Sequence, residues 1–190
     1  MPVFLTGSPP TWVLLIHSSY HLLLFMLIAG FTTQRHLAIS CGLIIGLGNV
    51  PRLIYGTENP YLESVASGSA ATSAMIVLVL SVRRFLSVSD VSTATISKAM
   101  CMYILLGITF ALLYYTVDIG LPDSFQASSG AATRGDLYYF SFVTMTTLGY
   151  GDIIPISSIS RSLALAQALL GQVFIAVVIG RLVSIHVGKS

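Results

Sequence analysis

Five stretches of the chain are apolar and long enough to cross a lipid bilayer, and they constrain the fold more than any other feature. They cover residues 12–31, 37–55, 64–82, 99–117 and 162–180. A helix needs about 20 largely apolar residues to cross the hydrocarbon core, because each residue adds ~1.5 Å. The run at 64–82 is the least apolar, since Ser and Ala dominate its first half. We therefore expect five transmembrane helices.

The composition argues against a soluble protein. Only 8% of the residues are charged and 55% are hydrophobic, whereas a soluble domain carries roughly 25% charged residues. The net charge of +2 is too small to favour a nucleic-acid partner. Cys41 and Cys101 each lie inside an apolar run, so we expect neither a disulfide framework nor a zinc cluster. These features predict an integral membrane protein whose surroundings are the lipid bilayer.

The positive residues divide unequally between the two sides that five spans would define. One side has six, namely Arg35, Arg83, Arg84, Lys98, Arg181 and Lys189, and the other has Arg52, Arg134 and Arg161. Cytoplasmic loops carry the excess of Lys and Arg. We therefore expect the N-terminus outside and the C-terminus in the cytoplasm, and the chain's modest size favours the plasma membrane.

One further charge-free stretch, residues 137–151, is too short to cross the membrane. As a helix it would measure about 22 Å, against ~30 Å for the hydrocarbon core. Aromatic side chains at Tyr138, Tyr139, Phe140 and Phe142 favour membrane depth over the surface. The segment therefore predicts a re-entrant helix that enters from the outer face.

The residues after this helix form a pattern suited to binding a dehydrated cation. They read Thr-Met-Thr-Thr-Leu-Gly-Tyr-Gly-Asp over residues 144–152. Gly149 and Gly151 permit a backbone of alternating handedness, because glycine adopts positive φ without steric cost. Carbonyl groups can then face one axis and replace the water shell of an ion, and the Thr147 hydroxyl can add a ligand at the inner end. One copy cannot surround an ion, so we expect a symmetric assembly.

Residues 141–152 resemble the pore-loop signature of potassium channels, whose filter usually reads Thr-Val-Gly-Tyr-Gly-Asp. The resemblance covers about residues 98–186 and includes a span on each side of the loop. It implies a homotetramer, K⁺ as the bound permeant ion, no cofactor and no catalysed reaction. The implied filter residues are Thr147, Leu148, Gly149, Tyr150 and Gly151, with K⁺ held at the first four.

Three positions depart from the family pattern. Leu148 replaces the common Val, but its ligand would be its carbonyl, so selectivity should survive. Tyr139 and Phe140 stand where many relatives have two Trp residues that brace the filter, and with Thr146 they are the expected supports. Val143 stands where some relatives have a Glu paired with the filter Asp. We therefore hypothesise that the Tyr139 hydroxyl is the partner of Asp152.

The resemblance divides the chain into two domains of an all-α membrane protein with five transmembrane helices, one re-entrant pore helix and a filter loop. Residues 1–97 would form an accessory domain of three spans, with packing or lipid sensing as possible roles. The pore domain, 98–190, would contain an outer helix at 98–117, an outer loop at 118–135, a pore helix at 136–146, the filter at 147–152 and an inner helix at 162–186.

The inner helix has a candidate cavity face. Helical spacing places Gln172, Ile175 and Ile179 together, and the family's inner helix implies that this face lines the pore. Gln172 would be its polar patch and Ile179 a hydrophobic constriction, although Gln172 could instead bond a neighbouring helix. Gly171 could bend the helix or permit close packing.

A voltage sensor needs a ladder of positive residues along one membrane helix. Adjacent Arg83 and Arg84 form no such ladder, so we expect little voltage dependence.

Two alternative functions share the same residues. A less selective cation channel is one. The other is an intramembrane aspartyl protease, whose Gly-x-Gly-Asp motif matches residues 149–152, but that chemistry needs a second Asp at membrane depth. Asp118 is the nearest candidate.

His17 and His21 have a spacing that can bind metal, yet hydrogen bonding between helices is favoured. His186 could sense pH or be inert.

Overall fold

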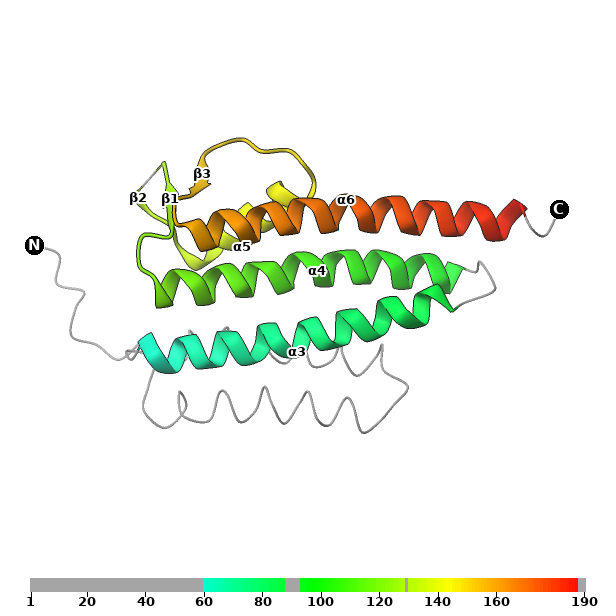
Figure 1. The fold of residues 1–190 in the computed structure, drawn as a ribbon, viewed down its shortest axis with the longest axis horizontal. Coiled ribbons are helices and arrows are strands. Elements are labelled where there is room, and N and C mark those ends of the chain that lie inside the picture. The colour runs from blue at the N-terminus through cyan, green and yellow to red at the C-terminus, as the bar shows by residue number, and fades with distance from the viewer. Residues whose placement is uncertain (1–59, 88–92, 129, 188–190) are drawn as a thin grey trace, which may run out of the picture.

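The computed structural model describes residues 60–87, 93–128 and 130–187. Three long helices, α3 (Pro60–Leu86), α4 (Thr93–Gly120) and α6 (Ser158–Val187), lie side by side along one direction (Figure 1). The shorter α5 (Arg134–Met145) begins at the end where the strands lie and stops well before the other end. The two expected spans before residue 60, together with His17 and His21, lie outside the described residues.

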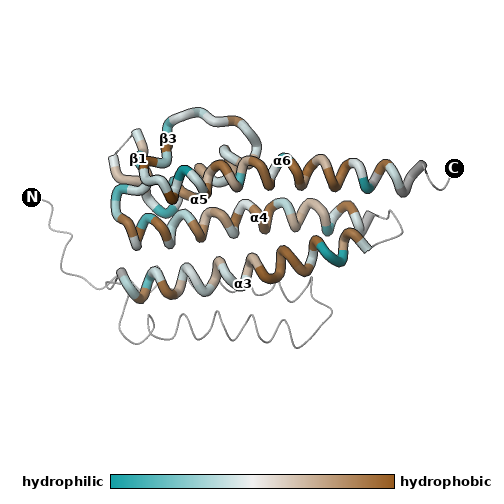
Figure 2. Tube along the Cα trace, in the orientation of Figure 1, coloured by the Kyte–Doolittle hydropathy of each residue, from teal (hydrophilic) through white to brown (hydrophobic). Residues whose placement is uncertain are grey.

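Each long helix contains a stretch that could cross a membrane, namely Tyr61–Leu86, Thr95–Gly120 and Ser158–Arg181. These match the third, fourth and fifth expected spans. Figure 2 shows hydrophobic residues along most of α6, and hydrophilic ones where α3 ends at Arg83 and Arg84.

The helices are longer than the apolar runs that predicted them. The expected third span at 64–82 became Pro60–Leu86, the outer helix at 98–117 became Thr93–Gly120, and the inner helix at 162–186 became Ser158–Val187. Backbone hydrogen bonding continues into polar flanks, whereas hydropathy marks only the part suited to lipid. α4 begins at Thr93, before the expected boundary between the two domains at residue 97.

Small residues hold α3 against α4 and explain the low hydropathy of the run at 64–82. Ala66, Ala70 and Ala74 are almost fully buried. Small side chains let two helices approach closely within a membrane. Polar contacts add to this packing, because the Thr116 hydroxyl donates to the Ser67 hydroxyl at 2.9 Å. The Ser- and Ala-rich segment is therefore an interface between helices.

A small sheet interrupts the expected all-α architecture, although most described residues are helical. Its order is β2-β1-β3, and β1 (Phe125–Ala127) pairs antiparallel with both β2 (Gly130–Ala131) and β3 (Ile153–Pro155). Strands of two and three residues are too short to show a period-2 pattern, so the outer loop at 118–135 looked irregular in the sequence. The sheet joins that loop to the segment after the filter.

The pore helix begins at Arg134, earlier than the expected residue 136, because Thr133 caps it. The Thr133 hydroxyl accepts from the Asp136 backbone N–H at 3.3 Å, and the Asp136 carboxylate accepts from the Thr133 N–H at 2.8 Å. This reciprocal pair is a capping box. The hydrogen bonds from Thr133 hold the pKa of Asp136 below its ordinary value. The helix ends at Met145 and not at 146.

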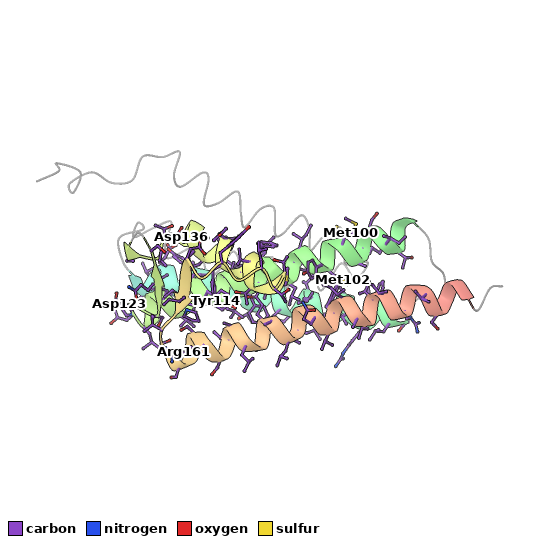
Figure 3. The ribbon with its side chains drawn as sticks, turned by 90° about the horizontal axis from the view of Figure 1, so that it is seen from above. Met100, Met102, Tyr114, Asp123, Asp136 and Arg161 are labelled. Atoms are coloured by element: carbon purple, nitrogen blue, oxygen red, sulfur yellow. The ribbon has the colours of Figure 1, made fainter. Side chains whose placement is uncertain are left out.

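The outer loop and the small sheet lie together at one end of the bundle. Figure 3 shows Asp123, Asp136 and Arg161 at the end where the strands lie, while Met100 and Met102 lie toward the opposite end. The loop and sheet thus lie at the end of the bundle where the pore helix begins.

Candidate functional site

The backbone of the candidate filter alternates in handedness. Thr147, Gly149 and Gly151 have φ of 60°, 57° and 78°, whereas Leu148 and Tyr150 between them have ordinary negative φ. Alternation of this kind turns successive carbonyl groups toward the same side of the chain. Positive φ at the β-branched Thr147 is an outlier for an L residue, so this segment adopts a conformation that isolated peptide would avoid.

The inner end of the filter is anchored on the last turn of α5. The Leu148 N–H donates to the Val143 carbonyl at 3.0 Å, and the Thr147 N–H donates to the Thr144 carbonyl at 3.1 Å. Thr146 is the C-cap residue, and its hydroxyl donates to the Phe142 carbonyl at 2.8 Å. The Thr147 hydroxyl donates to the Thr146 carbonyl at 2.6 Å, so its oxygen can still accept or ligate.

The outer end of the filter is anchored on the loop and sheet. Both the backbone N–H and the hydroxyl of Ser128 donate to the Asp152 carbonyl, at 2.9 and 3.0 Å. The chain then enters β3, which pairs with β1. The filter is therefore held at both ends by backbone hydrogen bonds, while Leu148 and Tyr150 between the anchors are exposed.

Tyr139 and Phe140 lie on different sides of the pore helix. The Tyr139 ring stacks parallel to Tyr150, with centroids 6.5 Å apart, and its hydroxyl lies near enough to the Asp152 carboxylate to interact with its charge. The Phe140 ring lies in the core, 5.2 Å from Tyr114 and 5.5 Å from Phe125. The family pattern predicts that both residues brace the filter. Within one chain only Tyr139 contacts a filter residue, because neighbouring residues of a helix point about 100° apart.

Replacing Tyr139 by Phe removes the hydroxyl near Asp152 but keeps the ring beside Tyr150. We expect conduction to be lost faster during sustained opening, because Asp152 then lacks a hydroxyl that could donate to it at the outer end of the filter. The decay of potassium current under a steady potential measures the effect. An unchanged decay would exclude this hydroxyl as a support.

A buried polar network joins the outer, pore and inner helices, and no spacing pattern in the sequence predicts it. Gln167 donates to the Ser141 carbonyl at 3.0 Å and to its hydroxyl at 2.7 Å, and it accepts from the Tyr114 hydroxyl. The Ser141 hydroxyl in turn donates to the Gly107 carbonyl at 2.7 Å. Gln167, Ser141 and Tyr114 are all fully buried. The network fixes α5 between α4 and α6.

Gly171 lies where α6 crosses the end of the pore helix. A Cβ at this position would meet the Met145 Cγ at 2.9 Å and the Met145 carbonyl oxygen at 3.1 Å. Of the two expected roles, bending and close packing, these contacts support close packing. The Tyr103 hydroxyl donates to the same Met145 carbonyl at 3.3 Å, so the C-terminal end of α5 lies between α4 and α6.

Replacing Gly171 by Ala tests this close approach. The added methyl group must displace Met145, and overpacking of this kind costs about 1–3 kcal/mol. We expect a lower thermal midpoint in detergent. Gly180→Ala is the matched control on the same helix, because a Cβ there meets nothing within 4 Å. Equal midpoints for the two variants would contradict the packing role.

The filter and α6 leave a large apolar surface uncovered within one chain. Only 11% of the apolar window of α6 is buried, against 44% for α3 and 50% for α4. The expected cavity residues Gln172, Ile175 and Ile179 all belong to this exposed surface, whereas Gly171 is buried. Because α6 is apolar on every side, it has surface for both a pore and a neighbouring subunit.

The carboxylates that a protease would need have separate partners. Asp118 accepts a hydrogen bond from the Phe125 backbone N–H at 3.3 Å, and Asp152 lies near the Tyr139 hydroxyl. Among the described residues, no three His, Cys, Asp or Glu side chains form a group that could hold a metal ion. The side chain of His186 lies outside that description.

Residues 100–187 match the "Ion channel" family model. Two-pore potassium channel 4 of Arabidopsis thaliana is 33% identical over 101 residues, which cover 52% of this chain and 36% of that protein. Two-pore potassium channel 1 of the same plant is 46% identical over 64 residues, 33% of this chain and 18% of the relative. Protein LctB of Bacillus caldotenax is 31% identical over 87 residues, 43% of this chain and 64% of the relative.

The chain thus spans about a third of the first of these relatives. The family match, with the three apolar helices, identifies an integral membrane protein. The match and the relatives together support the placement of residues 100–187, with their helix–filter–helix unit, in the potassium channel superfamily.

Proposed function

We propose that this protein is a potassium-selective channel that conducts K⁺ passively across the membrane. The observation that carries the proposal is the alternation of positive φ at Thr147, Gly149 and Gly151, in a segment fastened at both ends. Carbonyl groups presented in this way can replace the hydration shell of K⁺. The names of the relatives, two-pore potassium channels, support the same ion.

The conducting unit that we propose is a homotetramer. The exposed filter and the uncovered α6 support it, because further copies of the chain would cover both surfaces and close a ring of carbonyl groups. K⁺ would bind between the carbonyl layers of residues 147–151, with no cofactor and no catalysed reaction. Gln172 and Ile175 would line the cavity, and Ile179 would narrow its inner end.

The proposed orientation puts the sheet and the start of the pore helix outside the cell. Arg83, Arg84, Lys98 and Arg181 lie toward the other end of the three long helices and would face the cytoplasm, as the positive-inside rule favours. The membrane would be the plasma membrane, with the C-terminus inside.

Flux from reconstituted vesicles tests this function. Potassium that leaves KCl-loaded vesicles through a selective channel makes their interior negative, so these vesicles should take up tracer K⁺ from a low-potassium buffer. Vesicles loaded with NaCl should not. Equal flux with either salt would instead indicate a less selective cation channel. Absence of flux with both salts, from protein that is folded and inserted, would overturn the channel function.

We also propose that opening depends little on voltage. One charge that crosses the whole field contributes ~2.3 kcal/mol per 100 mV, which is roughly fiftyfold in an equilibrium constant. Arg83 and Arg84 are adjacent and exposed in the last turn of α3. We expect open probability to change far less than fiftyfold per 100 mV in single-channel recordings. A steep shift would place a sensor elsewhere in the chain.

A further inference from the structure

A residue of α3 reaches the first turn of the pore helix, although α3 lies outside the residues that match the channel family. Glu63 is in the first turn of α3, and Arg134 is the first residue of α5. A Glu63 carboxylate oxygen lies 3.5 Å from an Arg134 guanidinium nitrogen. The two side chains are only 10% and 15% exposed, so this ion pair is largely withdrawn from solvent.

Tyr115 of α4 contacts both members of the pair. Its hydroxyl donates to the same Glu63 oxygen at 3.1 Å, and the Arg134 guanidinium lies over its ring, 4.8 Å from the centroid. We call these three residues the Glu63–Tyr115–Arg134 cluster. It joins one residue from each of three helices at the end of the bundle where the pore helix begins.

The position of Arg134 gives the cluster a specific electrostatic task. The N-terminus of a helix carries about half a positive charge, so an Arg in its first turn is unfavourable there. A carboxylate beside the guanidinium offsets this repulsion, and low exposure strengthens the attraction because water screens it less. The ion pair with Glu63 therefore holds the N-terminus of α5 beside the first turn of α3.

A displacement at Arg134 would reach the filter through a rigid element. α5 has 12 residues, and its last carbonyls accept the N–H groups of Thr147 and Leu148. We propose that Glu63 is a positioning residue which, through Arg134, sets the placement of the pore helix and hence of the filter carbonyls. The accessory span α3 thereby contributes to ion discrimination. This inference rests on the proposed channel function.

The first test is Glu63→Gln, which keeps an oxygen that can accept from Tyr115 but removes the charge that holds Arg134. We expect the K⁺/Na⁺ permeability ratio of the reconstituted channel to fall roughly tenfold, because the attraction that places Arg134 beside α3 is lost. The exchange Glu63→Arg with Arg134→Glu restores opposite charges. It should return the ratio to within about threefold of the wild type.

Ser67→Ala is the matched control. Ser67 lies one turn further along α3 and accepts the hydrogen bond from Thr116 of α4, so its loss weakens the same helix pair without touching Arg134. We expect an unchanged permeability ratio. An equal loss of selectivity in Ser67→Ala and Glu63→Gln would show that general packing of α3 is responsible, and it would overturn the inference.

A second variant decides the matter where Glu63→Gln does not assemble. Tyr115→Phe removes only the hydroxyl that holds Glu63 and keeps the ring under Arg134. A smaller fall in the ratio supports the inference, and an unchanged ratio overturns it. Wild-type protein without potassium-selective flux would refute the proposed function itself, whereas selective flux that is insensitive to the cluster would refute only the role of Glu63.

Discussion

Replacing Gly149 by Ala is expected to abolish potassium conduction. Gly149 has φ of 57°, a conformation that costs an L residue about 1–2 kcal/mol. In the proposed tetramer the penalty would fall on one ring of four carbonyl groups, so it would reach about 4–8 kcal/mol for the assembly. Distortion of the carbonyl ring would cost less free energy than this strain, so the carbonyl groups would leave the positions that bind K⁺. We expect potassium flux from vesicles to drop at least about a hundredfold.

Gly120→Ala is the control for this substitution. Gly120 ends α4 with an ordinary negative φ, and a Cβ there meets nothing within 4 Å. A methyl group is also without neighbours at Gly149 within one chain, so the two sites differ in backbone conformation. Potassium flux from Gly149→Ala equal to that from Gly120→Ala would show that the positive φ of Gly149 has no part in conduction.

Replacing Gln167 by Met is expected to cause the largest loss of stability. Met has nearly the same shape as Gln but cannot donate to Ser141 or accept from Tyr114. The variant leaves buried polar groups without partners, each at a cost of about 1–3 kcal/mol. We expect the free energy of unfolding in detergent to fall by about 2–4 kcal/mol. The polar network that links α5 to α4 and α6 would then be broken.

Gln172→Met tests whether burial is the cause. The same change is made on the same helix, but Gln172 is exposed, whereas Gln167 is fully buried. We expect the unfolding free energy of this control to remain within about 0.5 kcal/mol of the wild type. Similar losses in the two variants would mean that the hydrogen bonds of Gln167 do not carry the effect.

The sequence predicts the helical framework well where a single physical signal decides. Apolar length locates α3, α4 and α6, and the short charge-free stretch at 137–151 locates α5. The pair Gly149 and Gly151 predicts alternating backbone, because only glycine adopts positive φ at no cost. Positive φ at Thr147 could not be foreseen, since a β-branched residue disfavours it and the anchors at Val143 and Thr144 impose it.

The side on which a polar residue of α6 lies could not be predicted. Gln167 and Gln172 are both set among apolar residues, and a helix that is apolar on every side gives no amphipathic pattern to orient it. The partners of Gln167, Tyr114 and Ser141, come from distant parts of the chain. The Glu63–Arg134 pair also joins residues far apart in sequence, so spacing alone carries no sign of it.

The two anchors of the filter fix the contour length of the segment between them. Leu148 is tied back to Val143, and the Asp152 carbonyl is tied to Ser128. Leu in place of the family's Val alters a side chain and leaves the spacing of backbone oxygens as it was. Deletion of one residue would instead shorten the segment between the two hydrogen-bonded ends, so the remaining carbonyl oxygens would shift along the pore axis. At Leu148 the number of residues between the anchors thus limits variation far more strictly than the identity of the side chain.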